Sequence, residues 1–564
     1  MKKKTIISLF TTCLLANSIV GCSSQSSTSD TLTVGINAAM NGVFSPLYYE
    51  SVYDGYAIDL IYQGLLAYNV NQKLQCELAK EMPTVSQDGL TYTFKLKKDI
   101  QFSDGTPLDA NDVKYTFTIL SDPSYTGRFS DYASNIVGYE EYNQQDAEEL
   151  TGVEVKDDQT VVFHLKKPRI DMLATLGTMP ICSNEQFDYT KGNTDEIETN
   201  TNQPIGSGAY TLNSFDKAVG ASFVRNKNFK ADKDTYRINK VVIKHTETST
   251  ELDELKSGTV DLLPQVSDAG KISSASSDSN LTYNTAPGNS IGFCFFNTTS
   301  GPTADKAVRQ ALAYATDRKS FSDNYFQYNE DASEEVKKEK LAYIPSVFGN
   351  PMSEDLGNVI RGDRDIEGLN TYEFSIDKAN AILDQAGWKR NEDGFRYKNG
   401  QQLVIRIMNA EGSKAMETLV PIITRDWKKI GVNLKQTIID FNTMLSTVGN
   451  DEELGNWETA VLANAFNDLS NNDLNGFYQT GNLNNYARVS NPNLDQYLKQ
   501  GTYTSDLDES TKNFEKAIVI ANDEAGYLPL YGANSFTLYN KRIKNLKTNS
   551  FYDWSDAIGS AYIE

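Results

Sequence analysis

The most informative stretch of this chain is DGLTYTFKLKKDIQFSDGTPLDANDVKYTF, residues 88–117. Its first part alternates polar residues with large apolar ones, namely Tyr92, Phe94 and Leu96. A period of two places the apolar groups on one face, as in a half-buried antiparallel strand. The chain then turns, because Gly105 can adopt a positive φ and Pro107 pushes the residue before it towards extended geometry. A strand followed by a turn is therefore predicted here.

A helix is predicted directly after this turn. Asp109 is a favourable N-cap residue, and Asp112 stands three positions later, as in a capping box. Val113, Phe117 and Leu120 follow at helical spacing and give the helix one apolar face. Judged by its residues alone, the stretch is a structural unit whose side chains are not arranged for chemistry.

The same stretch resembles the signature region of a known family, the extracytoplasmic solute-binding proteins of ABC transporters that take up peptides and nickel. The family pattern is DG-x-x-Y-x-F-x-L, followed by F-x-DG-x-P-(L/F)-x-A-x-D-V. The matching residues here are Asp88, Gly89, Tyr92, Phe94, Leu96, Phe102, Asp104, Gly105, Pro107, Leu108, Ala110, Asp112 and Val113. A match of this length is specific for the scaffold, although it does not identify the ligand.

Further landmarks of that family follow in family order, from about residue 60 to residue 531. A buried strand at 291–297 precedes a helix that matches D-x-x-V-R-x-A-L-x-x-A-x-D-R, from Asp305 to Arg318. Shorter landmarks are Ala386-Gly387-Trp388, Lys429-Ile430-Gly431-Val432 and Leu528-Pro529-Leu530-Tyr531. A β-α-β unit is predicted over 403–408, 412–430 and 432–438.

Length and charge narrow the class of protein. A chain of 564 residues exceeds one ordinary hydrophobic core, so two or three domains are expected. Its formal net charge is −22, and this becomes about −25 without Lys2, Lys3 and Lys4. An acidic field of this size repels nucleic acid and anionic lipid, so no nucleic-acid partner is expected.

The N-terminus resembles the leader of a bacterial lipoprotein. A short basic region precedes an apolar segment, 6–19, that is too short to span a bilayer. Ile19-Val20-Gly21-Cys22 resembles a lipobox, which predicts a signal peptide at 1–21 and lipidation of Cys22. Residues 22–30 would then form a flexible polar tether. The alternative is an ordinary secretory signal that contains a cysteine here by chance.

Few residues are arranged for catalysis or metal binding. Outside the leader and the lipobox, the cysteines are widely spaced and odd in number, so at most one disulfide can form among Cys76, Cys182 and Cys294. The two histidines, His164 and His245, lie in strand-like patterns. No CxxC, HExxH, GxSxG or P-loop motif occurs. The protein is therefore predicted not to be an enzyme and to need no cofactor or metal. A hydrolase whose site the sequence does not reveal is the remaining enzymatic alternative.

One partial motif makes a calcium-binding site an alternative interpretation of the segment after residue 470. Positions 1, 3, 5 and 6 of a calcium-binding loop are matched by Asn471, Asp473, Asn475 and Gly476. Position 12 is Asn482 rather than a bidentate glutamate. A polar loop is the simpler interpretation, and 465–485 are predicted to form one after a strand at 457–464.

The resemblance implies an α/β fold of the periplasmic-binding-protein type, class II or cluster C, with three lobes and a ligand cleft between two hinged halves. The implied boundaries are 31–60, 185–284 and 526–564 for a discontinuous domain I, 61–184 for domain II and 285–525 for domain III. Two crossings, near 284–290 and 520–530, would act as hinges. Ligand would shift the population towards a closed form.

The resemblance also implies where ligand binds. Peptide receptors of the family carry an aspartate shortly after a strand in the last third of the chain, and it pairs with the α-ammonium group of the peptide. Asp468 stands at about that spacing, and it is preceded by Phe466 and Asn467. A buried carboxylate would hold an ammonium group through a charge-assisted hydrogen bond. Weaker candidates for the cleft are Asn485, Tyr486 and the loop from Asn41 to Phe44.

The implied function is that of a lipid-anchored receptor that captures peptides outside the cytoplasmic membrane and delivers them to an ABC permease and its ATPases. It would act as a monomer at the outer face of the bacterial membrane, and contacts to the peptide main chain would make its side-chain specificity loose. Two alternatives remain open. The same scaffold suits another solute such as an oligosaccharide, and a receptor of this kind can serve signalling or adhesion without transport.

Overall fold

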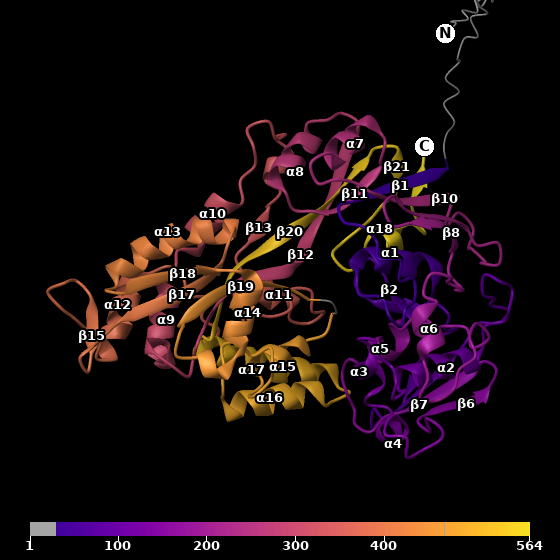
Figure 1. The fold of residues 1–564 in the computed structure, drawn as a ribbon, viewed down its shortest axis with the longest axis horizontal. Coiled ribbons are helices and arrows are strands. Elements are labelled where there is room, and N and C mark those ends of the chain that lie inside the picture. Colours follow the sequence, from indigo (N-terminus) through magenta and orange to yellow (C-terminus); the bar gives the residue numbers. More distant parts are fainter. Residues whose placement is uncertain (1–29, 467–468) are drawn as a thin grey trace, which may run out of the picture.

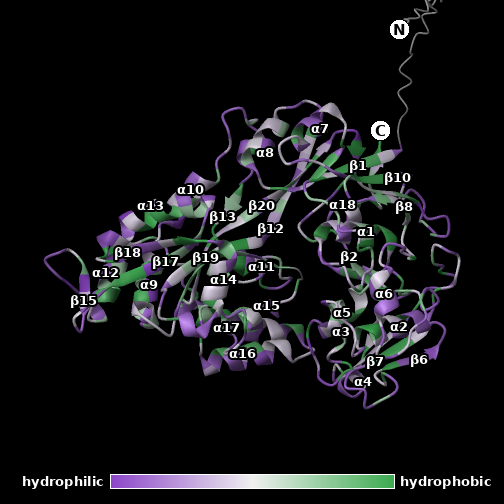
Figure 2. Cartoon of the chain, viewed as in Figure 1, coloured by the Kyte–Doolittle hydropathy of each residue, from purple (hydrophilic) through white to green (hydrophobic). Residues whose placement is uncertain are grey.

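The computed structural model describes residues 30–466 and 469–564. Figure 1 shows two lobes that lie side by side and are joined above by long strands. Helices and strands alternate along much of the chain, and the architecture is mixed α/β, as predicted. Figure 2 shows hydrophobic residues concentrated along the strands and hydrophilic residues on outward helix surfaces, which places the cores against the sheets.

Within the described residues, eleven strands form one sheet that passes through both lobes. In order across the sheet they are β18 (Asn433–Ile439), β17 (Val404–Ala410), β19 (Thr459–Ala465), β12 (Leu281–Phe296), β20 (Tyr527–Asn540), β11 (Leu262–Val266), β1 (Thr31–Ile36), β10 (Lys240–His245), β9 (Gly220–Arg225) and β8 (Tyr210–Asp216), with β13 (Ala342–Tyr343) beside β20. The sheet is mixed, because β1 and β10 pair in parallel whereas β12 and β20 are antiparallel. β20 lies between β12 and β11 and thereby connects the two halves of the sheet.

Helices pack on this sheet and build the rest of both lobes. They are α1 (Val52–Ile61), α2 (Ala110–Leu120), α3 (Ser130–Ala133), α4 (Tyr139–Asn143), α5 (Met172–Thr178), α6 (Asp195–Thr199), α7 (Glu251–Ser257), α8 (Ala269–Ser276), α9 (Lys306–Tyr314), α10 (Arg318–Tyr325), α11 (Gly357–Arg361), α12 (Ile376–Gln385), α13 (Lys414–Lys429), α14 (Phe441–Gly449), α15 (Asp473–Tyr478), α16 (Pro492–Thr502), α17 (Leu507–Glu524) and α18 (Trp554–Ala557). Short 3₁₀ helices occur at Pro302–Ala304, Val336–Lys338 and Asp451–Glu453.

The smaller sheets are peripheral. They are the hairpin β2 (Leu66–Tyr68) with β3 (Leu74–Cys76), the sheet of β4 (Thr84–Val85), β5 (Thr91–Lys95), β7 (Thr160–His164) and β6 (Val153–Asp157), the sheet of β14 (Lys389–Arg390), β15 (Arg396–Lys398) and β16 (Gln401–Gln402), and the pair β21 (Ile543–Lys544) and β22 (Tyr562–Ile563). β6 and β7 are consecutive in the chain and pair as an antiparallel hairpin.

Two long antiparallel strands, β12 and β20, carry the chain between the lobes (Figure 1). β12 contains the predicted crossing at 284–290, whereas the crossing predicted at 520–530 overlaps β20 only at residues 527–530 and otherwise falls on the end of α17 and the turn after it. The pairing of β12 with β20 shifts register between Pro287 and Ile291 and again between Gly292 and Phe293, so the ladder is interrupted midway. Interrupted pairing weakens a ladder locally, which is a suitable place for bending. The hinge role itself, like the three-domain division, stays a prediction.

Replacing Gly288 by alanine is expected to destabilise these crossing strands. A Cβ at this position would lie 2.2 Å from the backbone oxygen of Ala533 on β20. Backbone cannot move aside as a side chain can, so we expect a loss of about 1–3 kcal/mol in the free energy of unfolding. Urea denaturation of the ligand-free protein measures it. Gly455→Ala is the matched control, since its Cβ would meet no atom of the described residues within 4 Å. Equal stability of the two variants would contradict the prediction.

The stretch 88–117 folds as predicted in the lower part of one lobe. Tyr92, Phe94 and Leu96 are buried, and β5 pairs antiparallel with β7. Gly105 has a φ of 103°, in the region that glycine tolerates best. The ring of Phe94 meets that of Phe163 edge-on at 5.9 Å, so the strand packs into the core of this lobe.

The predicted capping box at the start of α2 is confirmed. The Asp109 carboxylate accepts from the backbone N–H of Asn111 at 2.7 Å, and Asp112 Oδ2 accepts from the N–H of Asp109 at 2.8 Å. Val113 and Phe117 are fully buried on the apolar face of the helix. Asp112 also accepts from the N–H of Asn184, which connects α2 to the segment behind it.

The helices and strands of the other lobe also agree with those predicted from the sequence, with one exception. The predicted β-α-β unit is confirmed as β17, α13 and β18, and the strand predicted at 457–464 is β19. The prediction that 465–485 form only a polar loop is wrong, because this segment contains α15. Leu474, Phe477 and Tyr478 are buried, and their packing in the core favours a helix in spite of the asparagine-rich sequence.

Two properties bear on the membrane and on redox chemistry. In the described part of the chain, no helix combines the length and hydropathy needed to cross a bilayer. Cys76, Cys182 and Cys294 are free thiols, so the one disulfide that the sequence allowed is not formed. Cys22 and the predicted leader lie outside the described residues.

Candidate ligand-binding site

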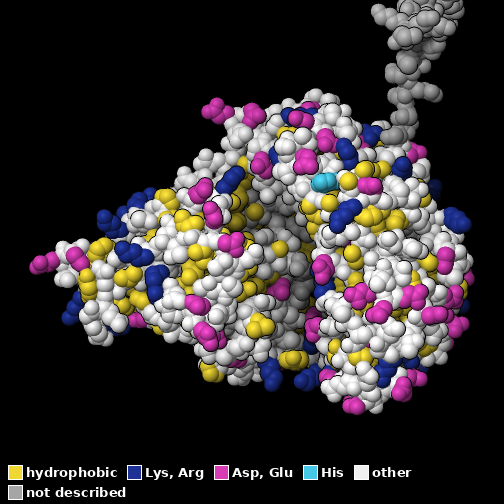
Figure 3. All heavy atoms as spheres, viewed as in Figure 1, with side chains coloured by type: hydrophobic (Ala, Val, Ile, Leu, Met, Phe, Trp, Pro, Cys, Tyr) yellow, Lys and Arg dark blue, Asp and Glu magenta, His cyan; other side chains and the backbone are white. Residues whose placement is uncertain are grey.

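A deep groove separates the two lobes (Figure 3). On one side it is bounded by the lobe of α11, α14 and α15, and on the other by the lobe of α3, α5 and β2 (Figure 1). The strands β12 and β20 cross above it. A groove between two lobes that are joined by a pair of strands is the geometry expected of a receptor that closes around a ligand.

The C-terminal segment 546–552 lies against the crossing strands. Asn284 Nδ2 donates to the carbonyl of Leu546 at 3.0 Å, and the Ser550 hydroxyl donates to the carbonyl of Pro287. Asn549 Nδ2 donates to the carbonyl of Val70 at 2.7 Å, in the turn between β2 and β3. The segment therefore connects the crossing strands to the β2–β3 hairpin.

A small number of described contacts bridge the groove. Lys73, in the β2–β3 turn, forms an ion pair with Glu354 of the opposite lobe. The N–H of Ile170 donates to the carbonyl of Thr502 at 3.1 Å, and the ammonium group of Lys167 lies 5.4 Å from the ring centre of Tyr503. Both members of the ion pair are substantially exposed, and exposed pairs contribute only about 0–1 kcal/mol. The two lobes are thus lightly held together across the groove.

Phe466 belongs to the core of its lobe rather than to an open wall. Its side chain is buried, and its ring centre lies 5.9 Å from that of Phe348. Its N–H donates to the carbonyl of Asn289 at 2.9 Å, and Asn289 Nδ2 donates back to the carbonyl of Phe466 at 3.0 Å. This reciprocal pair fixes the end of β19 on the crossing strand β12.

Asn467 and Asp468 lie outside the described residues. Leu469, directly after them, accepts a hydrogen bond through its carbonyl from the N–H of Glu354 at 3.2 Å. Glu354 is also the residue that pairs with Lys73 across the groove. The residues that flank the predicted ligand anchor are therefore attached to the crossing strand on one side and to the bridged edge of the groove on the other.

Two weaker candidates for the cleft, Asn485 and Tyr486, have different surroundings. Asn485 is buried, and its amide is committed to the chain around it: Nδ2 donates to the carbonyl of Val489 at 2.8 Å, and Oδ1 accepts from the N–H of the same residue at 3.0 Å. Tyr486 is half-buried, with its ring centre 5.7 Å from that of Phe295. Asn485 thus shapes its loop, while Tyr486 packs on the same core as Phe466.

The loop from Asn41 to Phe44 is held from inside. Asn41 is exposed, whereas Phe44 is fully buried and meets the ring of Phe215 edge-on at 5.1 Å. The N–H of Gly42 donates to Asp54 Oδ1 at 3.1 Å, and burial raises the pKa of Asp54. Gly42 has a φ of 84°, and a Cβ there would lie 2.4 Å from the Phe215 ring. Asp54 was not predicted from the sequence, although Gly42 within the loop was a signal of close packing.

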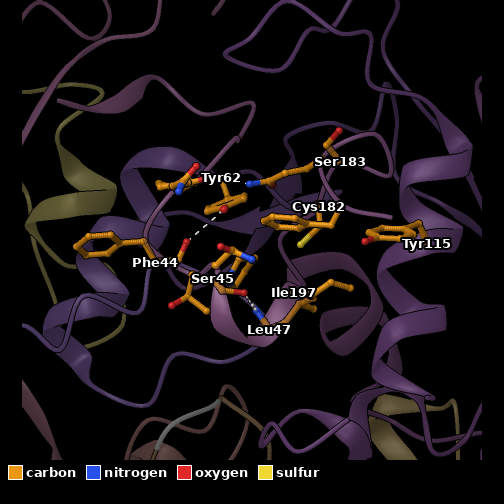
Figure 4. A pocket seen from close by; sticks show the side chains of 15 residues that line it. Phe44, Ser45, Leu47, Tyr62, Tyr115, Cys182, Ser183 and Ile197 are labelled. Atoms are coloured by element: carbon orange, nitrogen blue, oxygen red, sulfur yellow. Dashed lines mark hydrogen bonds between the residues drawn. The ribbon is translucent and has the colours of Figure 1, made fainter. Parts of the chain in front are cut away.

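A small cavity lies beneath this loop (Figure 4). Phe44, Tyr62, Tyr115 and Cys182 are among its lining residues, and its volume of about 20 Å³ admits little more than a water molecule. The Tyr62 hydroxyl donates to the carbonyl of Phe44 at 3.2 Å. Burial raises the pKa of the Cys182 thiol to about 12, and the charge of Asp112 adds to this effect. The thiol therefore stays protonated and is not prepared as a nucleophile.

A larger cavity of about 260 Å³ lies at the C-terminal end of β1. The Tyr53 hydroxyl donates to Asn37 Oδ1 at 2.8 Å, and Gln265 Nε2 donates to Asp553 Oδ2 at 3.0 Å. Tyr53, Asn37 and Gln265 line the cavity. Two acidic residues and a lysine also line the cavity, so both neutral and charged groups are available to orient a ligand there.

The partial calcium motif does not form a binding loop of the usual kind. Asp473 begins α15, and the amides of Asn471 and Asn475 donate to Asp355 Oδ1 at 2.6 Å and to Thr502 Oγ1 at 2.8 Å. Across the part of the chain that the structure describes, no three histidine, cysteine or acidic side chains gather as metal ligands would. His164 lies 3.4 Å from Glu154 on the surface of β7.

Comparison with known proteins identifies the scaffold. The model of the family "bacterial extracellular solute-binding proteins, family 5" matches residues 73–487. The oligopeptide-binding protein AppA of Bacillus subtilis is 24% identical over 540 residues, which cover 91% of this chain and 89% of that protein. Heme-binding protein A of Haemophilus influenzae is 26% identical over 83% of this chain and 81% of its own.

A solved structure has the same fold over nearly the whole chain. The ABC transporter substrate-binding protein CtaP of Listeria monocytogenes aligns with a TM-score of 0.77 and 22% identity, covering 95% of this chain and 99% of that protein. The compared proteins are solute-binding proteins rather than enzymes, which supports a binding role. The fold, the groove and the family match agree, and the chain belongs to the bacterial extracellular solute-binding proteins of family 5.

Proposed function

We propose that this protein captures peptides outside the cytoplasmic membrane and delivers them to an ABC importer made of a permease and its ATPases. The observation that carries the proposal is the groove between two lobes that β12 and β20 join and that few described contacts bridge. The family match and the relative named as an oligopeptide-binding protein support peptides as the ligand class.

Asp468 is proposed to hold the α-ammonium group of the peptide. It follows β19 by three residues, and Phe466 between them is fixed to Asn289 of the crossing strand. A carboxylate that pairs with an ammonium group out of water gains a charge-assisted hydrogen bond, which neutral groups cannot replace. The rest of the peptide would be held through its main chain, as an added strand, which leaves side-chain specificity loose.

The attachment to the membrane is part of the same proposal. Lipidation of Cys22 would anchor the protein to the outer face of the bacterial membrane, with residues 23–30 as a tether. A monomer suits this role, because one groove per chain is enough for delivery to one permease. Labelled palmitate that stays with the wild-type protein, but not with a Cys22→Ala variant, is the result that this part of the proposal requires.

A second candidate is a non-peptide solute. A relative of similar length, heme-binding protein A, carries a name for another ligand. An oligosaccharide would use the same amide and hydroxyl groups, and a signalling or adhesion receptor would keep the binding and lose the transport.

Native mass spectrometry of protein purified without added ligand tests the ligand class. We expect a ladder of bound masses in the range of short peptides, because a receptor that contacts mainly the peptide backbone retains a mixture. Protein unfolded and refolded in ligand-free buffer is the control and should lose the ladder. A single mass that is not a peptide would refute the peptide assignment, and peptide binding without any uptake defect on deletion would favour the signalling role.

A further inference from the structure

Two loops from opposite lobes meet at the lower end of the groove. One is the loop 166–171, which precedes α5, and the other is the segment 501–506, which leads from the end of α16 to α17. The N–H of Ile170 donates to the carbonyl of Thr502 at 3.1 Å. Figure 1 places α5 and α16 on opposite sides of the groove, well below the crossing strands β12 and β20. A small rotation about those strands would therefore part the two loops.

The contact caps the C-terminal end of α16. Thr502 is the last residue of this helix, and the last four carbonyl groups of a helix have no partner within it. The aligned peptide dipoles also give this end a partial negative charge. The opposite lobe supplies a donor, the N–H of Ile170, and a cation, because the ammonium group of Lys167 lies 5.4 Å from the ring centre of Tyr503. One lobe thus provides what the helix of the other lobe lacks.

The loop 166–171 is fixed by its own lobe. Arg169 Nε donates to Asp171 Oδ1 at 2.9 Å, and both side chains are largely buried. Asn135 Nδ2 donates to the carbonyl of Lys167 at 2.7 Å. These hydrogen bonds do not involve the opposite lobe, so the loop would keep its shape if the lobes parted.

The segment 501–506 is fixed in the same way. The Ser510 hydroxyl donates to the carbonyl of Gly501 at 2.7 Å. Asp506 is the N-cap of α17, and its carboxylate accepts from the N–H of Glu509 at 3.0 Å. Two preformed surfaces therefore meet across the groove, and they can engage or separate without local unfolding.

A glycine allows the lobes to approach this closely. Gly89, in the turn before β5, has a φ of 69°, and a Cβ built on it would lie 2.5 Å from the Cβ of Ser505. Ser505 belongs to the opposite lobe and is exposed. A side chain at position 89 would therefore push against the segment 501–506 and hold the lobes apart.

The contact is weak enough to be reversible. When the lobes part, water hydrates the N–H of Ile170 and the carbonyl of Thr502. The hydrogen bond therefore changes the ratio of closed to open protein by only about 2–12-fold. A cation over an exposed ring adds about 2–5-fold. Contacts of this strength can favour closure and still let the groove open.

We propose that the loop 166–171 and the end of α16 form a closure latch, which engages only when the lobes are closed and stabilises the closed form whether or not a ligand is bound. A ligand that binds the closed form gains apparent affinity from anything that populates this form. Residues of the latch would thus tune affinity without touching the ligand. The proposal does not depend on which ligand occupies the groove.

The amide proton of Ile170 reports directly on the latch. Hydrogen exchange is followed at pH 7 in protein that was unfolded and refolded in ligand-free buffer, with peptides that cover this amide. Rates are corrected for the effect of sequence on free amides. In the wild type we expect the Ile170 amide to be protected, because its N–H is bonded to Thr502 of the opposite lobe.

Two neighbouring lysines give a matched pair of variants. Lys167→Met removes the ammonium group from the end of α16 and should speed exchange of the Ile170 amide by about 2–5-fold. Lys166→Met makes the same change one residue earlier. The ammonium group of Lys166 pairs with Glu140 of its own lobe, so this variant should exchange as the wild type does. Both lysines are exposed, so neither change should prevent folding.

A second pair of variants tests the close approach of the lobes. Gly89→Ala should speed exchange of the Ile170 amide by about tenfold or more, because the added methyl group overlaps the Cβ of Ser505. Ser505→Gly removes that Cβ, so the double variant Gly89→Ala/Ser505→Gly should regain most of the protection. The strain of alanine at a positive φ is present in both proteins and cancels in the comparison. Small-angle X-ray scattering should show a larger radius of gyration for Gly89→Ala alone.

Three results would overturn the proposal. They are an Ile170 amide that exchanges as a free amide in the wild type, equal protection in Lys166→Met and Lys167→Met, and a double variant no more protected than Gly89→Ala. If Gly89→Ala does not fold, the lysine pair still decides. These measurements use no ligand, so their failure would leave the peptide proposal untouched, and a non-peptide ligand would leave the latch untouched.

Discussion

Replacing Arg318 by alanine should lower the free energy of unfolding by about 3–5 kcal/mol. Arg318 is only 7% exposed, and its guanidinium satisfies three carbonyl groups from separate segments. Nη1 donates to Pro345 at 2.9 Å and to Pro529 at 3.0 Å, and Nη2 donates to Thr371. Each buried carbonyl left without a donor costs about 1–3 kcal/mol, and the lost side chain also leaves a void.

Because the charge of Arg318 is buried, the stability of the protein is unusually sensitive to the loss of this side chain. Burial lowers the pKa of Arg318 to about 10, yet the group remains protonated near neutral pH. Because its partners are carbonyl dipoles rather than a carboxylate, no neighbouring side chain can substitute for it. The residue attaches the start of α10 to β20, one of the two strands that join the lobes. Its loss therefore weakens a point on which both lobes depend.

Urea denaturation of ligand-free protein measures the effect of Arg318→Ala. Arg318→Lys should fall between the alanine variant and the wild type, because an ammonium group keeps the charge but cannot reach all three carbonyls. Lys319→Ala is the matched control on the same helix. Lys319 is exposed and pairs with Asp323 one turn later, so about 0.5 kcal/mol or less is expected. A loss below about 1 kcal/mol for Arg318→Ala would show that water or neighbouring donors replace the guanidinium.

The second large effect concerns ligand binding. Asp468→Asn should weaken the binding of peptides with a free N-terminus by about 10–100-fold, which corresponds to the 1.5–3 kcal/mol of a hydrogen bond to a charged group. N-acetylated peptides of the same sequence lack the ammonium group, so their weaker binding should be unchanged. The substitution keeps the size of the side chain and removes only its charge. Isothermal titration calorimetry with matched peptide pairs gives both affinities.

The control for Asp468→Asn is Asp365→Asn, an exposed aspartate in the same lobe, which should bind both peptides as the wild type does. Equal weakening of free and acetylated peptides by Asp468→Asn would remove Asp468 from ammonium recognition. Unaltered binding of both would do the same. Either result would leave the family assignment intact, because that assignment depends on the scaffold and not on this side chain.

Local features of the fold were predictable from the sequence. The alternation of Tyr92, Phe94 and Leu96 needs only the period of a strand, and the capping box of Asp109 and Asp112 needs only four consecutive residues. The β-α-β unit ending in β18 was recognised for the same reason. In contrast, α15 was missed, because its asparagines suggest a loop and its helix depends on burial of Leu474 and Phe477 against other parts of the chain.

The candidate site was less accessible to sequence reasoning. The sequence does not distinguish an asparagine that faces ligand from one whose amide is hydrogen-bonded to the backbone of its own loop, as the amide of Asn485 is. Phe44 and Phe466 lie in the predicted segments, but both side chains are buried in cores. Ile170 and Thr502 are hydrogen-bonded across the groove although they lie far apart in the sequence, and no local pattern connects them. Contacts of this kind follow only from the way the chain is folded.

The position of β20 has a consequence for the order in which the chain can fold. β20 comprises residues 527–540 of 564, yet it lies in the middle of the large sheet, between β12 and β11. During synthesis from the N-terminus, β11 and β12 are both complete long before β20, the strand that pairs with each of them, has been made. Until then, the two halves of the large sheet are separate and each has an open edge strand. Such edges are prone to wrong pairing and aggregation. A chain that ends before residue 527 would lack the strand that joins its sheet, however well each half had folded.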